Sequence, residues 1–260
     1  MQKGKPPKRF GTRVGLPTML VRAVLEDGSG NVWVGTDAGL ARFANNHFVS
    51  RSRGKVGEDN LVWCLFEDRA EDLWVGTNSS LHRLRDDRLT VYGRPEGLPS
   101  DEPIAVHQDH AGRIWIGYKN SGVVQFDRQN PQKSRVYSKV DGLASNEVFS
   151  IRESANGDLL IGTRAGLSRM RNGHFVTYTP PFPPARRAVY DTLEDSLHRL
   201  WVGTMNGIFE LRGNTWRRVT EAERGNRGYI VALSEIRDGG VFRRWLGRFV
   251  VHPGGNPYAG

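Results

Sequence analysis

The sequence predicts an all-β protein built from short four-stranded antiparallel sheets that repeat along the chain. Five segments of the 260-residue chain share one pattern, and each contains four short apolar runs separated by turns. No window of helical length shows a 3.6-residue apolar period. A four-stranded repeat of about 40 to 45 residues is typical of a β-propeller blade. We therefore expect a β-propeller with five clear blades and a degenerate sixth, forming either a closed or an incomplete ring.

A large apolar anchor and a glycine recur in register in the five segments. Successive anchors are 41, 41, 45 and 41 residues apart, and the glycine always follows two residues later. The anchors are Trp33, Trp74, Trp115, Leu160 and Trp201, and the glycines are Gly35, Gly76, Gly117, Gly162 and Gly203. A buried tryptophan removes about 150–250 Å² from water, so we expect the anchors to hold neighbouring blades together. The glycines are expected to let backbones approach or to adopt positive φ.

The first repeat shows how the strands follow from the residues. An acidic, glycine-bearing turn at Glu26–Gly30 precedes Val32–Thr36, a run rich in β-branched and aromatic residues, as strands are. Leu40–Phe43 and Phe48–Ser50 follow as two further runs. A Gly-Leu loop, such as Gly97-Leu98, leads into the next repeat.

Three parts of the chain are predicted. Residues 1–13 form a basic leader without stable structure, residues 14–220 form the five blades, and residues 221–260 hold the degenerate sixth blade and a tail. In the sixth blade Trp245, 44 residues after Trp201, is expected near the anchor position. No blade strands are expected in Arg248–Gly260.

Charge and composition exclude several classes of protein. The formal charge is +9, but +6 lies in Met1–Ala23 and +5 in Arg212–Gly260, so the stretch between them carries −2. A nucleic-acid reader carries its positive charge on the folded surface, so we do not expect nucleic-acid binding. The single cysteine, Cys64, excludes an intrachain disulfide. The apolar run Leu61–Phe66 is too short to span a membrane, and Met1–Gly15 has no secretory signal pattern.

The repeats resemble the two-component regulator propeller repeat. The resemblance rests on an acidic turn, a Leu-Trp-Val-Gly-Thr strand, a Gly-Leu-x-Arg-Phe strand and a Gly-Leu-x-Ser-Asn loop. These motifs appear at Glu26-Asp27, Gly30, Trp33–Thr36, Gly39–Phe43, Leu73–Thr77, Gly142–Asn146, Ile161–Thr163 and Gly166–Arg169. The resemblance extends over about Gly15 to Thr220.

The resemblance implies a function in bacterial signal transduction. Such blades form the sensor region of hybrid two-component histidine kinases and of some membrane-bound diguanylate cyclases, usually as seven-bladed rings facing the periplasm. It therefore implies a ligand-sensing module without catalysis of its own, whose ligand is a small molecule such as a saccharide. Any kinase or cyclase activity would lie in a downstream domain. With five clear repeats, the chain looks like a partial or truncated copy.

Two other functions remain open. A protein-interaction scaffold would use the blade edges, which also offer a surface for self-association, and the proline-rich segment Pro180–Arg187. That segment is also consistent with a rigid spacer, which we favour. A propeller lyase or glycosidase is the third alternative, although paired carboxylates across a pocket cannot be identified from the sequence.

The candidate ligand-binding residues follow the second strand of each repeat, where the residue type varies on a constant frame. The loop at this position and the loop between blades are expected to emerge on the same face. The candidates are Asp37, Asn78, Lys119, Arg164 and Met205, together with Arg186 and Arg187 of the proline-rich segment. Arginines at such positions suit an anionic sugar or a carboxylate.

No catalytic residue, cofactor or metal site is predicted. The chain has neither a nucleophile elbow nor a phosphate-binding loop motif. His107 and His110 flank Asp109 in a turn and lack further nearby ligands, so a polar turn is favoured over a shared metal. The repeated acids Asp27, Asp68, Asp109 and Asp195 lack the calcium-loop pattern, and we expect them to bond their own turns.

Overall fold

The computed structural model describes residues 10–51, 61–219, 230–235, 241–245 and 248–251. The chain divides into two compact units, Met1–Pro95 and Glu96–Gly260, which are described separately. Strands dominate both units, and the helical segments in the described residues are short 3₁₀ turns such as η1 (Thr12–Val14). The predicted division at residues 13 and 220 remains a prediction.

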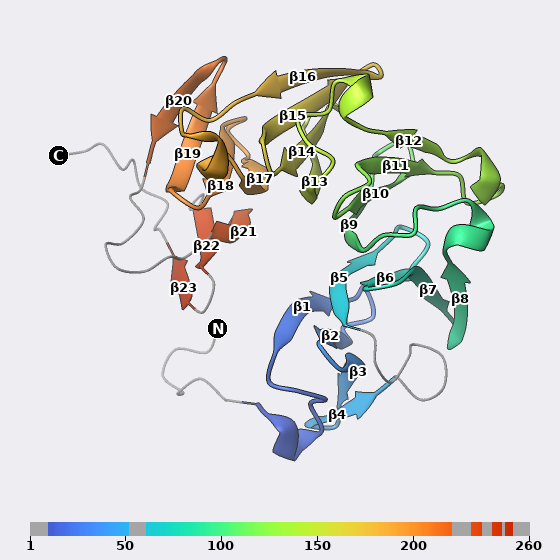
Figure 1. Ribbon diagram of the computed structural model, residues 1–260. Helices are drawn as coiled ribbons and strands as arrows, with labels where there is room; N and C mark the ends of the chain where they lie inside the picture. Colours follow the sequence, from blue (N-terminus) through green and yellow to red (C-terminus); the bar gives the residue numbers. More distant parts are fainter. Residues whose placement is uncertain (1–9, 52–60, 220–229, 236–240, 246–247, 252–260) are drawn as a thin grey trace. The chain divides into compact units, whose positions relative to one another are not determined.

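The first unit contains two four-stranded antiparallel sheets, which we call blades 1 and 2 (Figure 1). Blade 1 consists of β1 (Val21–Glu26), β2 (Val32–Thr36), β3 (Gly39–Ala44) and β4 (His47–Ser50). Blade 2 consists of β5 (Val62–Glu67), β6 (Leu73–Thr77), β7 (Leu81–Arg85) and β8 (Arg88–Tyr92). Each strand pairs with its neighbour in sequence, as the repeat predicts.

The second unit contains three more blades of the same order. Blade 3 consists of β9 (Pro103–Gln108), β10 (Ile114–Tyr118), β11 (Val123–Phe126) and β12 (Arg135–Tyr137). Blade 4 consists of β13 (Val148–Glu153), β14 (Leu159–Thr163), β15 (Gly166–Arg171) and β16 (His174–Tyr178). Blade 5 consists of β17 (Val189–Glu194), β18 (Leu200–Thr204), β19 (Gly207–Arg212) and β20 (Thr215–Arg218). The five predicted blades are therefore confirmed.

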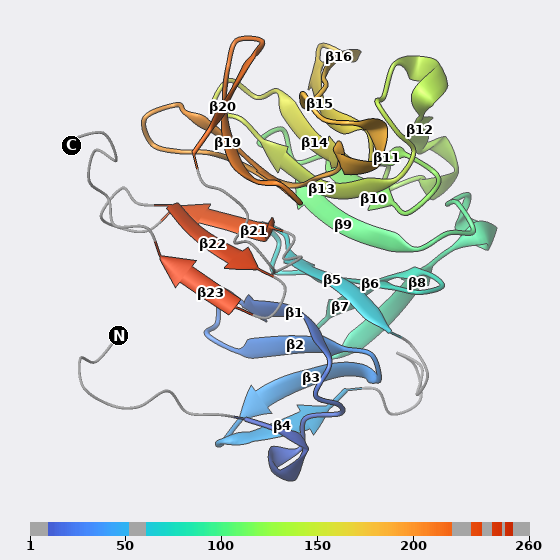
Figure 2. The same ribbon diagram turned by 60° about the vertical axis from the view of Figure 1, so that its left-hand side comes forward.

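A three-stranded sheet follows blade 5, and we call it blade 6. It consists of β21 (Ile230–Glu235), β22 (Val241–Trp245) and β23 (Arg248–Val251), which lie side by side in Figure 2. The prediction of no strand after Arg248 is therefore wrong. Trp245 lies on the second strand, near the anchor position that the strand register gives to Phe242, 41 residues after Trp201. Trp245 occupies the position of Thr204 at the end of the strand.

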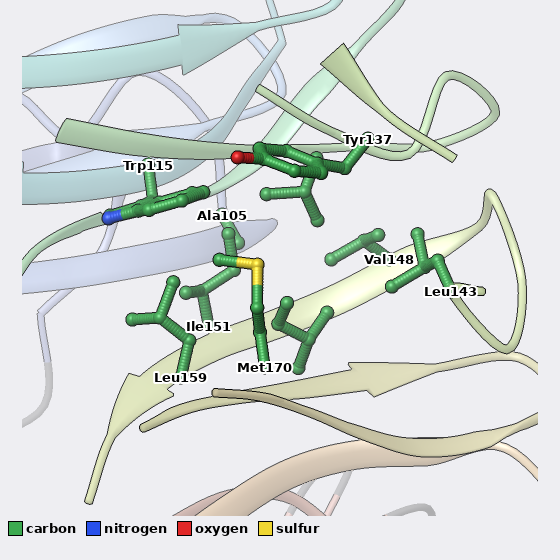
Figure 3. Close-up of a cluster of buried hydrophobic side chains, with 10 residues drawn as sticks. Ala105, Trp115, Tyr137, Leu143, Val148, Ile151, Leu159 and Met170 are labelled. Atoms are coloured by element: carbon green, nitrogen blue, oxygen red, sulfur yellow. The ribbon is translucent and has the colours of Figure 1, made fainter. Parts of the chain in front are cut away.

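The anchors fill the space between blades, which is why the second strands are apolar on both faces. Trp74 and Trp115 are 0% and 1% exposed. Figure 3 shows Trp115 and Tyr137 of blade 3 packed against Ile151, Leu159 and Met170 of blade 4. Burial of one such aromatic side chain stabilises the stack by about 4–6 kcal/mol before entropy is subtracted.

The repeated glycines let blades approach closely. A Cβ atom on Gly117 would lie 2.6 Å from Cγ1 of Val148, on the first strand of the next blade. A Cβ atom on Gly162 would lie 2.6 Å from the carbonyl oxygen of Val189, again one blade further on. Neither glycine has positive φ, so close approach is the reason for glycine here.

The acidic turns supply two different contacts. Asp109 accepts a hydrogen bond from the indole of Trp115 within its own blade at 2.8 Å, and the same bond recurs from Trp33 to Asp27, Trp74 to Asp68 and Trp201 to Asp195. The glutamate that ends a first strand accepts a backbone N–H from the turn of the preceding blade. These bonds join Glu67 to Gly28 at 2.7 Å, Glu153 to His110 at 2.8 Å and Glu194 to Ala155 at 3.2 Å. Within the two units the turns therefore tie blade 1 to blade 2, blade 3 to blade 4 and blade 4 to blade 5.

The segment before β1 is ordered from Phe10 onward. The Phe10 ring contacts Phe43 and Phe48 with centroids 5.1 and 5.9 Å apart, and Leu16 is buried beside them. The prediction of an unstructured leader is therefore wrong for Phe10–Arg13, because aromatic packing on blade 1 holds them. Residues 1–9 of that prediction lie outside the described residues.

Candidate functional site

Five of the seven predicted ligand-binding residues directly follow the second strand of a blade. In four of the five, the backbone N–H group donates to the residue immediately before the first strand of the same blade. These bonds run from Asp37 to Leu20, Asn78 to Leu61, Lys119 to Glu102 and Arg164 to Glu147, at 3.0 to 3.3 Å. Each of these positions is therefore fixed beside the start of a first strand.

The loops at this end of a blade meet, as the sequence predicts. In blade 3 the carboxylate of Asp101, in the loop that enters the blade, accepts hydrogen bonds from the backbone of Asn120 at 2.6 Å and the hydroxyl of Ser121 at 2.9 Å. Asn120 and Ser121 belong to the turn after the second strand. In blade 5 Asn206 of the same turn donates to the carbonyl of Arg186 at 3.2 Å.

Three of the predicted charged side chains are paired within their own blade. Lys119 bonds Glu102 at 2.8 Å, Arg164 lies 3.8 Å from Glu147, and Asp37 accepts from Arg22 at 2.6 Å. These ion pairs offset the charge that the sequence suggested for an anionic ligand. Asn78 and Met205 complete the repeat position in blades 2 and 5 as uncharged side chains.

The proline-rich segment packs on blade 5. Phe182 contacts Phe209 edge to face with ring centroids 5.2 Å apart. Arg187 donates to the carbonyl of Phe182 at 2.8 Å, across η5 (Pro184–Arg186). Arg186 is exposed. The internal bonds of the segment suit the spacer interpretation, whereas a role in binding a partner stays a prediction.

A second set of residues at the same end is not evident from the repeat pattern. In each first strand the register with the second strand shifts after the outermost pair, which leaves one unpaired residue at a β-bulge. The bulge residues are Arg22, Trp63, Ile104, Phe149, Tyr190 and Val231. Bulges are common beside functional sites because they redirect a side chain. An alignment of the first apolar runs would have revealed the large residues at this position.

Aromatic rings from consecutive blades meet at these bulges. The rings of Phe149 and Tyr190 in the second unit have centroids 4.9 Å apart, and both residues are only partly buried. In the first unit the guanidinium of Arg22 stacks over Trp63 at 4.8 Å. First strands contact one another from blade to blade, β9 with β13 and β13 with β17, so Phe149 and Tyr190 lie on the inner strands of the second unit (Figure 1).

An ion pair between an exposed arginine and a buried aspartate lies one residue beyond Tyr190. Arg152 of β13 bonds Asp191 of β17 with Nη2–Oδ2 at 2.9 Å, and Asp191 also accepts the backbone N–H of Leu233 in β21. The charge of Asp191 raises the pKa of Arg152. This pair ties three consecutive first strands together and fixes the backbone beneath the aromatic pair.

The repeated aspartates are structural. Burial raises the pKa of Asp109, but hydrogen bonds from Trp115 and Arg113 outweigh it, so the pKa lies below its usual range. The pKa of Asp195 shows the same balance with Trp201 and Arg199. The oxygens of both carboxylates are engaged by the turn and the indole.

The two histidines of blade 3 lie beside one carboxylate, that of Glu153. His110 is bonded to Glu153 through Nδ1, and Nε2 of His107 lies 4.0 Å from the same carboxylate. In the described part of the chain no group of three or more His, Cys, Asp or Glu side chains is arranged to hold a metal ion. His47 and His174 begin the fourth strands of blades 1 and 4.

Comparison with known proteins supports the family resemblance of the repeats. The family model "Two component regulator propeller" matches residues 15–38 and 57–79. A histidine kinase P4 of Formosa agariphila is 36% identical over 78 residues, which cover 26% of this chain and 6% of the kinase. The matched region is thus a small part of that relative.

Solved structures share the fold at low sequence identity. The extracellular domain of the putative hybrid two-component system BT3049 from B. thetaiotaomicron matches with a TM-score of 0.77 and 18% identity, over 96% of this chain and 37% of that domain. The extracellular domain of BT4673 from the same organism matches with a TM-score of 0.76 and 20% identity, over 90% of this chain and 31% of that domain. Virginiamycin B lyase from Staphylococcus aureus matches with a TM-score of 0.71 and 14% identity, over 90% and 84% of the two chains.

The matched structures are β-propellers of different functions, so they support the fold rather than an activity. Within the described residues, no helix has the length and apolarity needed to cross a bilayer. The repeated motif, the family match and the four-stranded blades agree with one another. At residues 15–38 and 57–79 the chain carries repeats of the two-component regulator propeller type.

Proposed function

We propose that the chain is a ligand-binding sensor module of a bacterial two-component system and has no catalytic activity of its own. The observation that supports this best is the pair of bulge residues Phe149 and Tyr190, whose partly exposed rings meet at the end of the inner strands. The loops predicted to bind ligand end beside the same strands.

The chemistry of this end suits a small molecule with an apolar face and polar edges. Aromatic faces bind flat apolar surfaces, and few polar groups are needed to orient a ligand. Glu147 directly precedes the strand of Phe149 and lies beside Arg164, so the two charges lie at the start of that strand. A saccharide ring has this combination of apolar C–H face and hydroxyl edge.

The extracellular domains of BT3049 and BT4673 share this fold, which supports a location outside the cytoplasmic membrane. The proposed module would pass its signal to an output domain. A binding module needs only a change of affinity between two states for such signalling, and no bond needs to be made or broken.

Binding can be tested by a thermal-shift screen of the 260-residue chain against saccharides, followed by calorimetric titration. A ligand that binds the folded state raises the melting temperature. Phe149→Ala and Tyr190→Ala should each weaken its binding at least tenfold. Val176→Ala is the matched control, because Val176 is 53% exposed on the fourth strand of blade 4. Equal affinity of all three variants and the parent would contradict the proposed site.

The absence of catalysis is tested with the same ligand. Prolonged incubation with the protein should leave the ligand chemically unchanged, as followed by mass spectrometry. Turnover that disappears in a site variant would instead favour the enzyme alternative.

A further inference from the structure

An arginine-lined cavity lies on blade 2, on the hairpin that joins β7 to β8. Its volume is about 450 Å³, and its walls are formed by Arg83, Arg85, Asp86, Arg88 and Thr90. The residues predicted from the repeat and the bulge residues are all absent from this wall, so the cavity is separate from the proposed sensor site.

The strand register places two like charges directly opposite each other in this hairpin. Arg85 pairs with Arg88, and two residues further along Arg83 pairs with Thr90. Side chains two residues apart on one strand share a face of the sheet. The three guanidinium groups and the hydroxyl are therefore gathered on one face. Like charges directly opposite across a hairpin are destabilising.

The surrounding acids compensate only part of this positive charge. The carboxylate of Asp72, which is fully buried, bonds Arg83 at 2.6 Å and also pairs with Arg85. Asp87 of the turn pairs instead with Arg51 at 3.2 Å. Among the described residues no acidic side chain forms an ion pair with Arg88. With Asp72 and Asp86 counted against the three arginines, the cavity carries one net positive charge.

Blade 4 carries the same buried arrangement without the additional groups. Asp158 bonds Arg169 at 2.6 Å and Arg171 at 2.7 Å, as Asp72 does with Arg83 and Arg85. The cross-strand partners there are His174 opposite Arg171 and Val176 opposite Arg169. The Asp–Arg–Arg set is therefore complete as a structural element without a further arginine. Arg88 and Thr90 are what blade 2 adds to it.

We propose that the cavity of blade 2 binds an oxyanion group, such as a carboxylate, sulfate or phosphate. Arg88 and the outer edge of Arg85 would hold the anion, and the hydroxyl of Thr90 would donate to it. Guanidinium groups suit this because their parallel N–H donors match two oxygens of one anion. The bound charge would remove the repulsion between Arg85 and Arg88. This inference does not depend on the proposed sensor function.

The test is a calorimetric and thermal-shift titration of the 260-residue chain with sodium sulfate, sodium phosphate and sodium acetate, each at constant ionic strength set with sodium chloride. Sulfate or phosphate binding without acetate binding assigns the site to tetrahedral anions, and the reverse assigns it to carboxylates. Arg88→Gln should weaken binding at least tenfold, and Thr90→Val about threefold. Without added oxyanion, Arg88→Gln should melt at a higher temperature than the parent, because the like-charge pair is gone.

Arg171→Gln in blade 4 is the matched control and should leave the affinity unchanged, because its hairpin lacks the second arginine. The proposal is overturned if none of the three oxyanions raises the melting temperature above the chloride reference. It is equally overturned if Arg88→Gln binds as the parent does. A melting temperature of Arg88→Gln below that of the parent without oxyanion would show that Arg88 has a structural partner, and would also contradict the proposal.

Discussion

Blades 3 and 4 carry different pairs of residues at the anchor position and at the turn position that precedes it. Blade 3 uses Trp115 with Asp109, whereas blade 4 uses Leu160 with Ser154 at the equivalent positions. Both anchors are buried, at 1% and 0% exposure. The anchor and its turn residue change together, because a buried indole N–H needs an acceptor and a buried carboxylate needs donors. Ser154 instead donates to the backbone of Asp158 and the side chain of Asn156.

The largest expected effect is the loss of stability when an anchor is truncated, and the larger anchor should lose more. Trp115→Ala should lower the free energy of unfolding by about 4 kcal/mol, and Leu160→Ala by about 3 kcal/mol. The tryptophan variant also leaves Asp109 without its indole partner. Urea unfolding followed by far-UV circular dichroism measures both. Equal losses would contradict the larger contribution assigned to the tryptophan anchor.

Blade 2 extends the comparison, because a histidine occupies the inter-blade position held by Val124 in blade 3. His82 is 2% exposed and bonds Ser80 at 2.8 Å. Burial lowers the pKa of His82 to about 4 from an unfolded value near 6.5. The unfolded state then binds the proton first as the pH falls, so stability is full above about pH 6.5 and is lost toward pH 4.

The expected loss from His82 amounts to about 3 kcal/mol between pH 6.5 and 4. His82→Val should remove this part of the pH dependence, and the difference between the two urea-unfolding curves measures it. His174→Val, an exposed histidine on blade 4, serves as the control and should keep the parent profile. Parallel pH profiles for the parent and His82→Val would refute the assignment.

The coupling of anchor and turn can be measured with a double-mutant cycle. Asp109→Ser and Trp115→Leu convert blade 3 to the pair found in blade 4. Each single variant should destabilise the protein, because it leaves the other buried group of the hydrogen bond without its partner. The double variant removes both groups, so its loss should be about 2 kcal/mol smaller than the sum of the two single losses. Additive losses would mean that the pair is not coupled and that the resemblance to blade 4 has no energetic basis.

The smallest effect concerns the contact between blades 3 and 4. Glu153→Gln keeps an acceptor for the backbone of His110 but removes its charge, so a loss of about 1 kcal/mol is expected. Gln108 stands at the same repeat position in blade 3, where it bonds its own turn at Gly112. Gln108→Ala should therefore cost less than Glu153→Gln in the same urea assay. The opposite order would remove the distinction between the two contacts.

The sequence alone determined the repeat, the four strands of each of five blades and the burial of the anchors. These follow from local residue patterns, since Val32–Thr36 and its equivalents are apolar on both faces and are bounded by turn residues. The meeting of the loops at Asp101 and Ser121 also followed from the sequence. Each strand pairs with its neighbour in sequence, so every second connection lies at the same end of a blade.

Only the tertiary structure decided which residues meet across blades. The bulges at Phe149 and Tyr190 depend on the register between two strands, and the bond from His110 to Glu153 joins residues 43 positions apart. The sixth anchor position has the same origin, since the sequence placed it only near Trp245 and the strand pairing assigns it to Phe242, three residues earlier. Local sequence patterns specify the strands of a blade, whereas strand register and blade stacking decide which side chains lie at its edges.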